Sequence, residues 1–334
     1  MKILSKRLSD PFVQLFWKTQ INILRACPPL CGLVSRLTFN AYQNRRLYAK
    51  GLLLVAAQAP HVLLLHLRDK RENRVVLPRV SLIVTTRCTL HCDKCLGHCP
   101  DMEDRDTPTA DLLRDIQTLY SCVDTIYDIT ITGGETFLHP DLDQIVRACA
   151  ATGKAGNINL ITNGTVVPGA KVLAALRETK ATVKISRYPA ALQPKVEQLK
   201  SLLEENDIRY FHEIGTSWVD TGTFGQLKDG SAQRRFSLCV LKLGLVCCWG
   251  KLHMCGESAV LTTEGLIPDC KEDYIDLRSI NTADFRGQLK KLLKRPTVSA
   301  CSYCLGQTYK TPKIPVAVQR IPPSGPPPVP GSER

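Results

Sequence analysis

Three cysteines stand four and then three residues apart, directly after an apolar run of the chain. They are Cys88, Cys92 and Cys95, and all lie within residues 87–95. Three thiolates on one short loop can bind three irons of an iron–sulfur cluster and leave the fourth iron without a protein ligand. A zinc knuckle is the alternative, since His91, His98 or Cys99 could complete a four-ligand zinc site. The loop alone does not decide between these two metals.

A second group of residues that could bind a ligand follows the next apolar run. Gly133 and Gly134 would let the backbone approach a ligand closely, and Glu135 could accept hydrogen bonds from an ammonium group. Two further polar segments, residues 162–165 and 184–188, follow later apolar runs in the same way. These segments indicate a composite site only if the fold brings them together.

Short apolar runs alternate with helical patterns between residues 80 and 214. We expect strands at 80–85, 127–132, 157–162, 183–186 and 208–214, a helix at 109–123, and helices that begin at Pro140, Pro168 and Pro194. Such alternation predicts βα units and a parallel sheet, with functional residues at the carboxyl ends of its strands. Each polar segment above stands at the end of one of these strands.

In these motifs and their order, residues 78–220 resemble the radical S-adenosylmethionine superfamily. The resemblance implies an α/β fold with a partial (βα)6 TIM-like barrel. It implies that Cys88, Cys92 and Cys95 bind a [4Fe-4S] cluster whose open iron chelates S-adenosylmethionine. It also assigns Gly133, Gly134 and Glu135 to the methionyl amino group, Ser186 and Arg187 to the carboxylate, and Asn163 to the ribose.

The chain departs from the superfamily pattern at two positions. Lys94 stands where an aromatic residue usually precedes the third cysteine, and Thr136 stands where proline often follows the glutamate. These changes leave the cluster prediction unaltered but weaken any prediction of how the adenine is held.

The resemblance also implies a reaction. An electron donor such as a flavodoxin or ferredoxin would reduce the cluster, the carbon–sulfur bond of S-adenosylmethionine would break, and the 5′-deoxyadenosyl radical would abstract hydrogen from a substrate. The cofactor carries this chemistry, while the protein excludes water and aims the radical.

Cysteines return in the last third of the chain. Cys239, Gly250 and Cys255 have the spacing that opens SPASM and twitch domains, and Cys301 and Cys304 supply a second pair. This resemblance implies one auxiliary [4Fe-4S] cluster in a domain at residues 221–310. Cys247 competes with Cys239 or Cys255 as a ligand, and structural zinc or no metal at all are the alternatives.

The substrate is expected by analogy to be a peptide or protein side chain, because SPASM and twitch domains commonly accompany such chemistry. A sugar or other small metabolite is the alternative. A non-catalytic zinc-binding module is the second alternative, but nucleic acid is not an expected partner, because aromatic residues make up only 6% and no RNA-binding motif is present.

Length and charge describe the rest of the chain. The 334 residues suggest two domains, or one large domain with appendages. The fifteen cysteines without a secretory segment suggest a cytoplasmic protein with reduced thiols. Residues 1–80 carry fourteen lysines and arginines against three acidic residues, so most of the net charge of +13 lies there. We expect residues 1–77 to form a basic, mainly helical extension that meets an anionic membrane surface or an acidic partner.

Two further expectations concern the ends of the chain. The apolar segment 51–67 is short and interrupted by polar residues, so it fits a membrane interface better than a membrane span. Residues 311–334 contain eight prolines and are expected to form a disordered tail.

Overall fold

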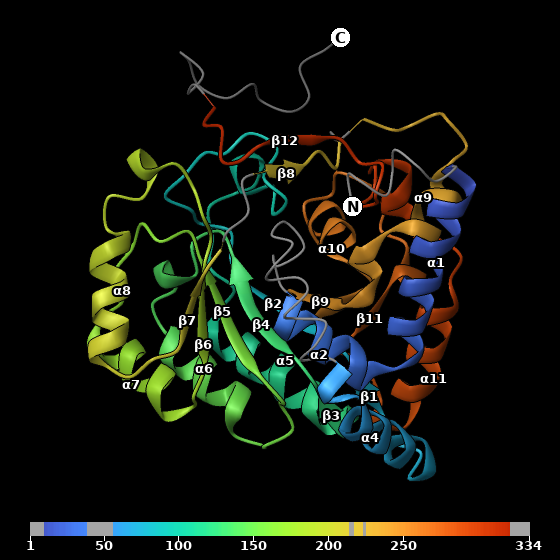
Figure 1. Cartoon of the computed structure of the whole chain (residues 1–334), viewed down its shortest axis with the longest axis horizontal. Helices are drawn as coiled ribbons and strands as arrows, with labels where there is room; N and C mark the ends of the chain where they lie inside the picture. The colour runs from blue at the N-terminus through green and yellow to red at the C-terminus, as the bar shows by residue number, and fades with distance from the viewer. Residues whose placement is uncertain (1–9, 39–55, 214–216, 223–224, 321–334) are drawn as a thin grey trace.

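A computed structural model describes residues 10–38, 56–213, 217–222 and 225–320. Its centre is an eight-stranded sheet in the order β11-β10-β9-β2-β4-β5-β6-β7 (Figure 1). The strands are β2 (Val80–Thr85), β4 (Ile129–Gly133), β5 (Ile158–Thr162), β6 (Thr182–Ile185), β7 (Tyr210–His212), β9 (Leu245–Cys248), β10 (Lys251–His253) and β11 (Tyr274–Asp276). The neighbours from β9 to β7 pair in parallel, and β10 and β11 are antiparallel.

The alternation expected from the sequence is confirmed. Strands β2, β4, β5, β6 and β7 follow one another in the sheet as in the chain, and they are separated by α5 (Thr109–Cys122), α6 (Leu142–Ala150), α7 (Ala170–Glu178) and α8 (Val196–Glu205). Leu82, Ile131 and Leu160 are buried on these strands, as expected where helices cover a parallel sheet. Among the described strands β7 and β11 are the two edges, so the sheet is open.

The cysteine-rich part of the chain extends this same sheet. Strand β9 pairs with β2, and β9 and β10 form a hairpin. Trp249 and Gly250 form its turn with φ of 49° and 78°, the left-handed conformations that tight hairpin turns require. The hairpin leads into α10 (Gly256–Thr263), and α11 (Thr282–Lys294) follows β11.

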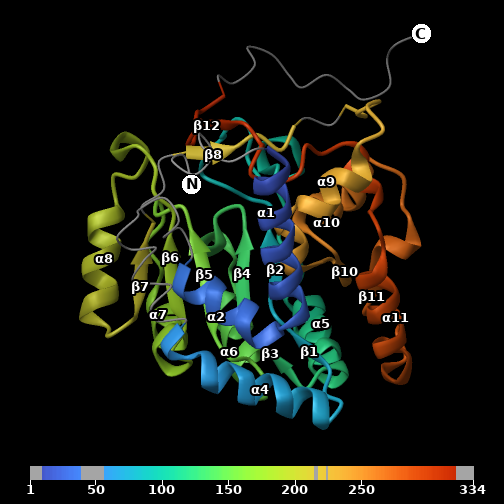
Figure 2. The same ribbon diagram turned by 45° about the vertical axis from the view of Figure 1, so that its right-hand side comes forward.

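The described part of the basic extension is helical and packs against the rest of the molecule. Its helices are α1 (Asp10–Ala26), α2 (Pro28–Thr38) and α4 (Ala59–Arg71), and it ends in the short strand β1 (Val76–Leu77). Helix α1 lies beside α9 (Ala232–Leu238), and α4 lies across the amino-terminal end of the sheet (Figure 2). Residues 1–9 and 39–55 lie outside the described residues, and so does the start of the apolar segment 51–67. None of the helices that the structure describes has the length and apolar character needed to cross a membrane.

The structure differs from the sequence-based expectation at residues 311–320. Instead of a disordered tail, these residues contain β12 (Lys313–Pro315), which pairs with β8 (Ser217–Val219) in an antiparallel ribbon. The ribbon lies beyond the carboxyl ends of the parallel strands, at the top of Figure 1. Backbone pairing with β8 orders this segment in spite of its prolines, because a proline carbonyl can still accept: the Pro312 carbonyl accepts from the Asp220 N–H at 2.9 Å. Residues 321–334 lie outside the described residues.

Candidate active site

The three predicted cysteines lie on the loop that leaves the carboxyl end of β2. Cys92 is buried, and Cys88 and Cys95 are half-buried. Burial raises the pKa of Cys88 to about 11. A hydrogen bond from the neighbouring Cys99 thiol lowers the pKa of Cys95 to about 6, which makes Cys95 the more readily ionised of the two. Cys99 therefore favours the ionised form of a predicted ligand residue.

The Gly-Gly turn after β4 lies directly against the base of this loop. A Cβ atom on Gly133 would stand 2.1 Å from the Thr85 carbonyl oxygen, and one on Gly134 would stand 2.2 Å from the Arg87 carbonyl oxygen. The backbone N–H groups of Gly134 and Glu135 donate to these same two oxygens, at 2.9 and 2.8 Å. The two glycines are thus required for packing between the turn and the cysteine loop.

Glu135 is fully buried at the junction of β4 and β5, and its carboxylate is bound by the chain itself. It accepts hydrogen bonds from the Phe137 N–H at 3.0 Å, from the Asn163 N–H at 2.8 Å, and from the Thr162 hydroxyl. Burial raises the pKa of Glu135 to about 7. The carboxylate therefore fixes the carboxyl ends of two adjacent strands, and its role toward S-adenosylmethionine stays a prediction.

Asn163 connects the end of β5 to the cysteine loop. Its side-chain N–H group donates to the Thr89 hydroxyl at 2.9 Å and to the Cys88 sulfur at 3.6 Å. Gln193, which the sequence analysis did not single out, donates to the backbone carbonyls of Asn163 and Ser186. The predicted residues Cys88, Glu135, Asn163 and Ser186 therefore meet at the carboxyl ends of the parallel strands, whereas Arg187 is exposed.

Lys94 is paired with the residue that follows β8 in the ribbon. Its ammonium group lies 3.4 Å from the Asp220 carboxylate, just after β8. Close to the loop, Tyr188 packs edge-on against Trp218, with 5.7 Å between ring centroids. Burial and the nearby Cys92 and Cys95 thiols raise the pKa of Tyr188. An aromatic pair thus stands near a loop that lacks the usual aromatic residue.

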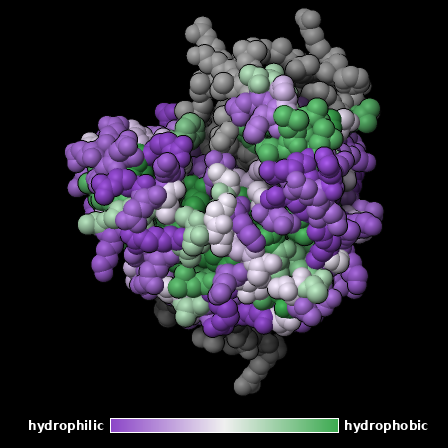
Figure 3. Space-filling model, turned by 90° about the horizontal axis from the view of Figure 1, so that it is seen from below, coloured by the Kyte–Doolittle hydropathy of each residue, from purple (hydrophilic) through white to green (hydrophobic). Residues whose placement is uncertain are grey.

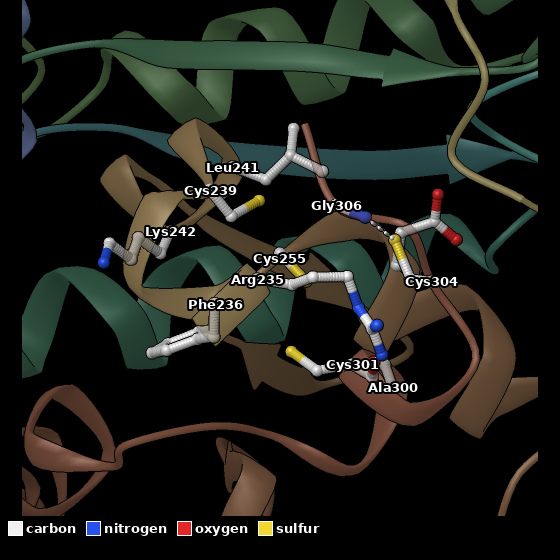
Figure 4. A pocket seen from close by; sticks show the side chains of 11 residues that line it. Arg235, Phe236, Cys239, Leu241, Lys242, Cys255, Ala300, Cys301, Cys304 and Gly306 are labelled. Atoms are coloured by element: carbon white, nitrogen blue, oxygen red, sulfur yellow. Dashed lines mark hydrogen bonds between the residues drawn. The ribbon is translucent and has the colours of Figure 1, made fainter. Parts of the chain in front are cut away.

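The four C-terminal cysteines named from the sequence line one small cavity (Figure 4). Cys239, Cys255 and Cys304 are buried, and Cys301 is half-buried. Backbone N–H groups point at two of these sulfurs: Gly306 donates to Cys304 at 3.2 Å and Gln307 to Cys239 at 3.3 Å. Cys247 is outside this group and belongs to the main hydrophobic core. The N–H···S bonds suit thiolate ligands, which accept hydrogen bonds.

The cavity holds about 20 Å³, room for one water molecule. An iron–sulfur cluster is larger than this cavity, so the four cysteine side chains would have to move apart to admit one. Among the described residues, no three histidine, cysteine or acidic side chains are close enough together to bind a single metal ion. Zinc bonds to sulfur are only about 2.3 Å long, so these thiols do not form a ready zinc site either.

A buried pair of side chains lies between the two cysteine groups. His98, three residues after Cys95, is 2.7 Å from the carboxylate of Glu257 on α10. Glu257 also lines the cavity of the second cysteine group. Hydrogen bonding and charge from Glu257 raise the pKa of His98 against the opposing effect of burial. The two cysteine groups are therefore joined through the protein interior.

One family model matches the part of the chain that forms most of the parallel strands. Residues 82–199 match the model of the Radical SAM superfamily. A GTP 3′,8-cyclase of Pelotomaculum thermopropionicum is 30% identical over 129 residues, which is 37% of this chain and 38% of that protein. A GTP 3′,8-cyclase of Stenotrophomonas maltophilia is 30% identical over 93 residues, or 27% of this chain and 28% of that protein. The chain thus spans under two-fifths of the length of these relatives.

Solved structures include more distant neighbours. BtrN in complex with AdoMet and 2-DOIA is 19% identical, with a TM-score of 0.45 over 68% of this chain and 92% of BtrN. Streptococcus suis SuiB bound to its precursor peptide SuiA is 17% identical, with a TM-score of 0.35 over 48% of this chain and 37% of SuiB. Residues 82–199 of this chain are thus similar to the radical S-adenosylmethionine superfamily.

Proposed function

We propose that this chain is an enzyme that cleaves S-adenosylmethionine reductively and abstracts hydrogen from a substrate. The observation that carries the proposal is the convergence of the cysteine loop, the Gly-Gly-Glu turn and Asn163 at the carboxyl ends of β2, β4 and β5. When bound, the [4Fe-4S] cluster and S-adenosylmethionine supply one-electron cleavage and the hydrogen-abstracting radical.

The residues of this chain would hold and orient those groups. Cys88, Cys92 and Cys95 would bind the cluster, and the N–H group of Asn163 would support the Cys88 sulfur. The Glu135 carboxylate holds the Asn163 backbone in place, so it would position Asn163 as well. Ser186 and Arg187 are proposed for the carboxylate of S-adenosylmethionine.

We further propose an auxiliary [4Fe-4S] cluster at Cys239, Cys255, Cys301 and Cys304. What supports it is that four cysteines from distant segments line one cavity and that backbone N–H groups point at two of the sulfurs. Such a cluster would accept the electron left after hydrogen abstraction, which suits an oxidative outcome on a peptide or protein side chain.

A small-molecule substrate is the second candidate. It is favoured by the curated relatives, which are named for a reaction of GTP. The two candidates differ in which added compound raises the rate of 5′-deoxyadenosine formation: a peptide, or a nucleotide or sugar.

The proposed partners are a flavodoxin- or ferredoxin-like electron donor and an anionic membrane surface. On α4, Leu63, Leu64 and Leu67 are more than half exposed, and basic residues end the same helix. Seen from below, hydrophobic side chains lie among hydrophilic ones on the surface (Figure 3). Co-sedimentation of the protein with phosphatidylserine vesicles tests the membrane proposal. Replacement of these three leucines by serine should abolish the co-sedimentation.

Anaerobic reconstitution with iron and sulfide tests the enzyme itself. We expect about eight irons per chain and formation of 5′-deoxyadenosine once a reductant is added. The variant with Cys88, Cys92 and Cys95 replaced by Ala should lose cleavage and keep about four irons. The Cys301→Ala, Cys304→Ala variant should keep the first cluster. Binding of zinc without cleavage would contradict the proposal.

A further inference from the structure

The segment that follows the last cysteine pair returns to the first cysteine loop. We define the strap as residues 313–320, which comprise β12 and the five residues after it. Cys92 and Gln319 face each other in an antiparallel bridge. The Asp93 N–H donates to the Val318 carbonyl at 2.6 Å, and the Arg320 N–H donates to the His91 carbonyl at 2.8 Å. The strap is thus paired with the cysteine loop through the backbone.

The side chain of Gln319 is fixed between the strap and the loop. Its carbonyl oxygen accepts from the His91 N–H at 2.9 Å. Its N–H group donates to the Cys92 sulfur at 3.1 Å and to the Ala317 carbonyl at 2.8 Å. Because the His91 N–H can only donate, this network fixes which end of the amide faces the sulfur.

One charged contact holds the end of the strap, and a second links the residue after β8, the partner strand of β12, to the cysteine loop. Arg320 forms a bidentate pair with Asp101, at 2.5 and 2.9 Å, just beyond the cysteine loop. At the other end, the Asp220 N–H donates to the Pro312 carbonyl, and the Asp220 carboxylate pairs with Lys94. Bidentate arginine–carboxylate pairs fix geometry as well as adding energy.

The backbone of the strap is also held in an uncommon conformation. Ala317 has φ of 51°, in the left-handed region that residues with a side chain rarely adopt, and it is buried. Such a conformation persists only where the surroundings determine it. It turns the chain so that Gln319 points at Cys92.

We infer that Gln319 is a positioning residue for the Cys92 ligand, and that the strap covers this ligand from solvent. The inference rests on the proposed function, under which Cys92 binds a [4Fe-4S] cluster. A hydrogen bond to a ligating sulfur stabilises the reduced, more negative state of an iron–sulfur cluster, so the Gln319 N–H should raise the reduction potential.

Two variants test this inference. Gln319→Ala removes the donor and opens space above Cys92, and Gln319→Glu keeps the shape but directs an acceptor oxygen at the sulfur. Gln198→Ala, at an exposed position of α8, is the matched control. Because Gln319 is half-buried at the surface of the fold, the variants should remain folded, which circular dichroism checks.

The first measurement does not need a cluster. In the metal-free full chain, alkylation of Cys92 by iodoacetamide should be several-fold faster in Gln319→Ala than in the wild type and the control. Trypsin leaves Cys88 and Cys92 on one peptide, residues 88–94, so tandem mass spectrometry must assign the modified cysteine. Equal alkylation rates in all three proteins would overturn the inference that the strap covers Cys92.

The second measurement uses the reconstituted protein. The midpoint potential of the first cluster, followed by electron paramagnetic resonance in a protein whose Cys301 and Cys304 are replaced by Ala, should become more negative from wild type to Gln319→Ala to Gln319→Glu. An unchanged midpoint potential at full iron content would overturn the inference that Gln319 acts on the cluster through its hydrogen bond to Cys92. If the wild type forms no cluster, the proposed function fails, and the alkylation rates still decide whether the strap covers Cys92.

Discussion

The Glu135 side chain is completely buried, so its ionised form loses its hydration and is disfavoured relative to the neutral form. Burial raises its folded-state pKa to about 7 from an ordinary value of 4.5. A carboxyl group with a raised pKa contributes stability that is fully present below about pH 4.5 and is lost as the pH rises through 7. The difference corresponds to about 3 kcal/mol, at about 1.4 kcal/mol per pKa unit.

We therefore expect Glu135→Gln to abolish this part of the pH dependence. Between pH 4.5 and 7, the free energy of unfolding of the metal-free wild type should fall more steeply than that of the variant, whatever constant offset the substitution adds. Urea denaturation at several pH values measures the slopes. Glu197→Gln, at an exposed position of α8, should keep the wild-type slope, and parallel slopes for wild type and Glu135→Gln would contradict the expectation.

Single residues were predictable from the sequence where their chemistry is local. The spacing of Cys88, Cys92 and Cys95 is a property of one short loop, and so is the Gly-Gly turn. Gln319 and Glu257 could not be found, because an ordinary glutamine and glutamate acquire their roles only through contacts with Cys92 and His98, 227 and 159 residues away. The packing role of Gly133 and Gly134 against the Thr85 and Arg87 carbonyls is likewise visible only in three dimensions.

At the scale of elements, α5 is joined to the residues after β11 by an ion pair that is buried on the aspartate side only. Asp115 on α5 is 2% exposed, and Arg278 lies 3.2 Å from it. Burial raises the pKa of Asp115 in spite of this partner. Arg278 is one-third exposed, so solvent screens part of the attraction.

We expect Arg278→Ala to destabilise the fold by about 2 kcal/mol, because it leaves a buried carboxylate without its partner. Urea denaturation measures the loss. Arg114→Ala, which removes an exposed pair on the same helix, should cost less than about 0.5 kcal/mol. If Asp115→Asn added to Arg278→Ala caused a further loss of the same size, the two side chains would not be coupled.

Most elements of the parallel sheet were predictable, because each carries its own apolar period. The sequence placed a strand at 80–85 and a helix at 109–123, where β2 and α5 begin and end within one residue of these limits. The return of β9 to pair with β2 was not predictable, since no local pattern specifies a partner 165 residues away. β12 was missed because its prolines resemble those of a disordered tail.

At the scale of the whole molecule, the basic N-terminal extension is part of the folded body. Arg25 donates to the Leu293 carbonyl on α11, and the Tyr127 hydroxyl donates to the buried Asp69 carboxylate at 2.5 Å. Arg74 pairs with the same carboxylate. The extension therefore covers surfaces of residues 78–310 that would otherwise meet water.

Deletion of residues 1–75 should for this reason lower the thermal midpoint markedly or prevent folding, rather than remove only a docking surface. Differential scanning fluorimetry measures the effect. Leu64→Ser, at an exposed position of α4, should leave the midpoint unchanged. A truncated protein with the wild-type midpoint would show that the extension is independent of the body.

The contact between Gln319 and Cys92 has a consequence for biosynthesis. The two residues are 227 positions apart, so ribosomes working at roughly 5 to 20 residues per second complete the strap roughly 11 to 45 s after the cysteine loop. During that interval a nascent chain presents Cys92 without its cover. Under the proposed function, delivery of iron and sulfide to this loop would be easiest before the strap folds onto it, and release of a damaged cluster from the finished protein would require the strap to open first.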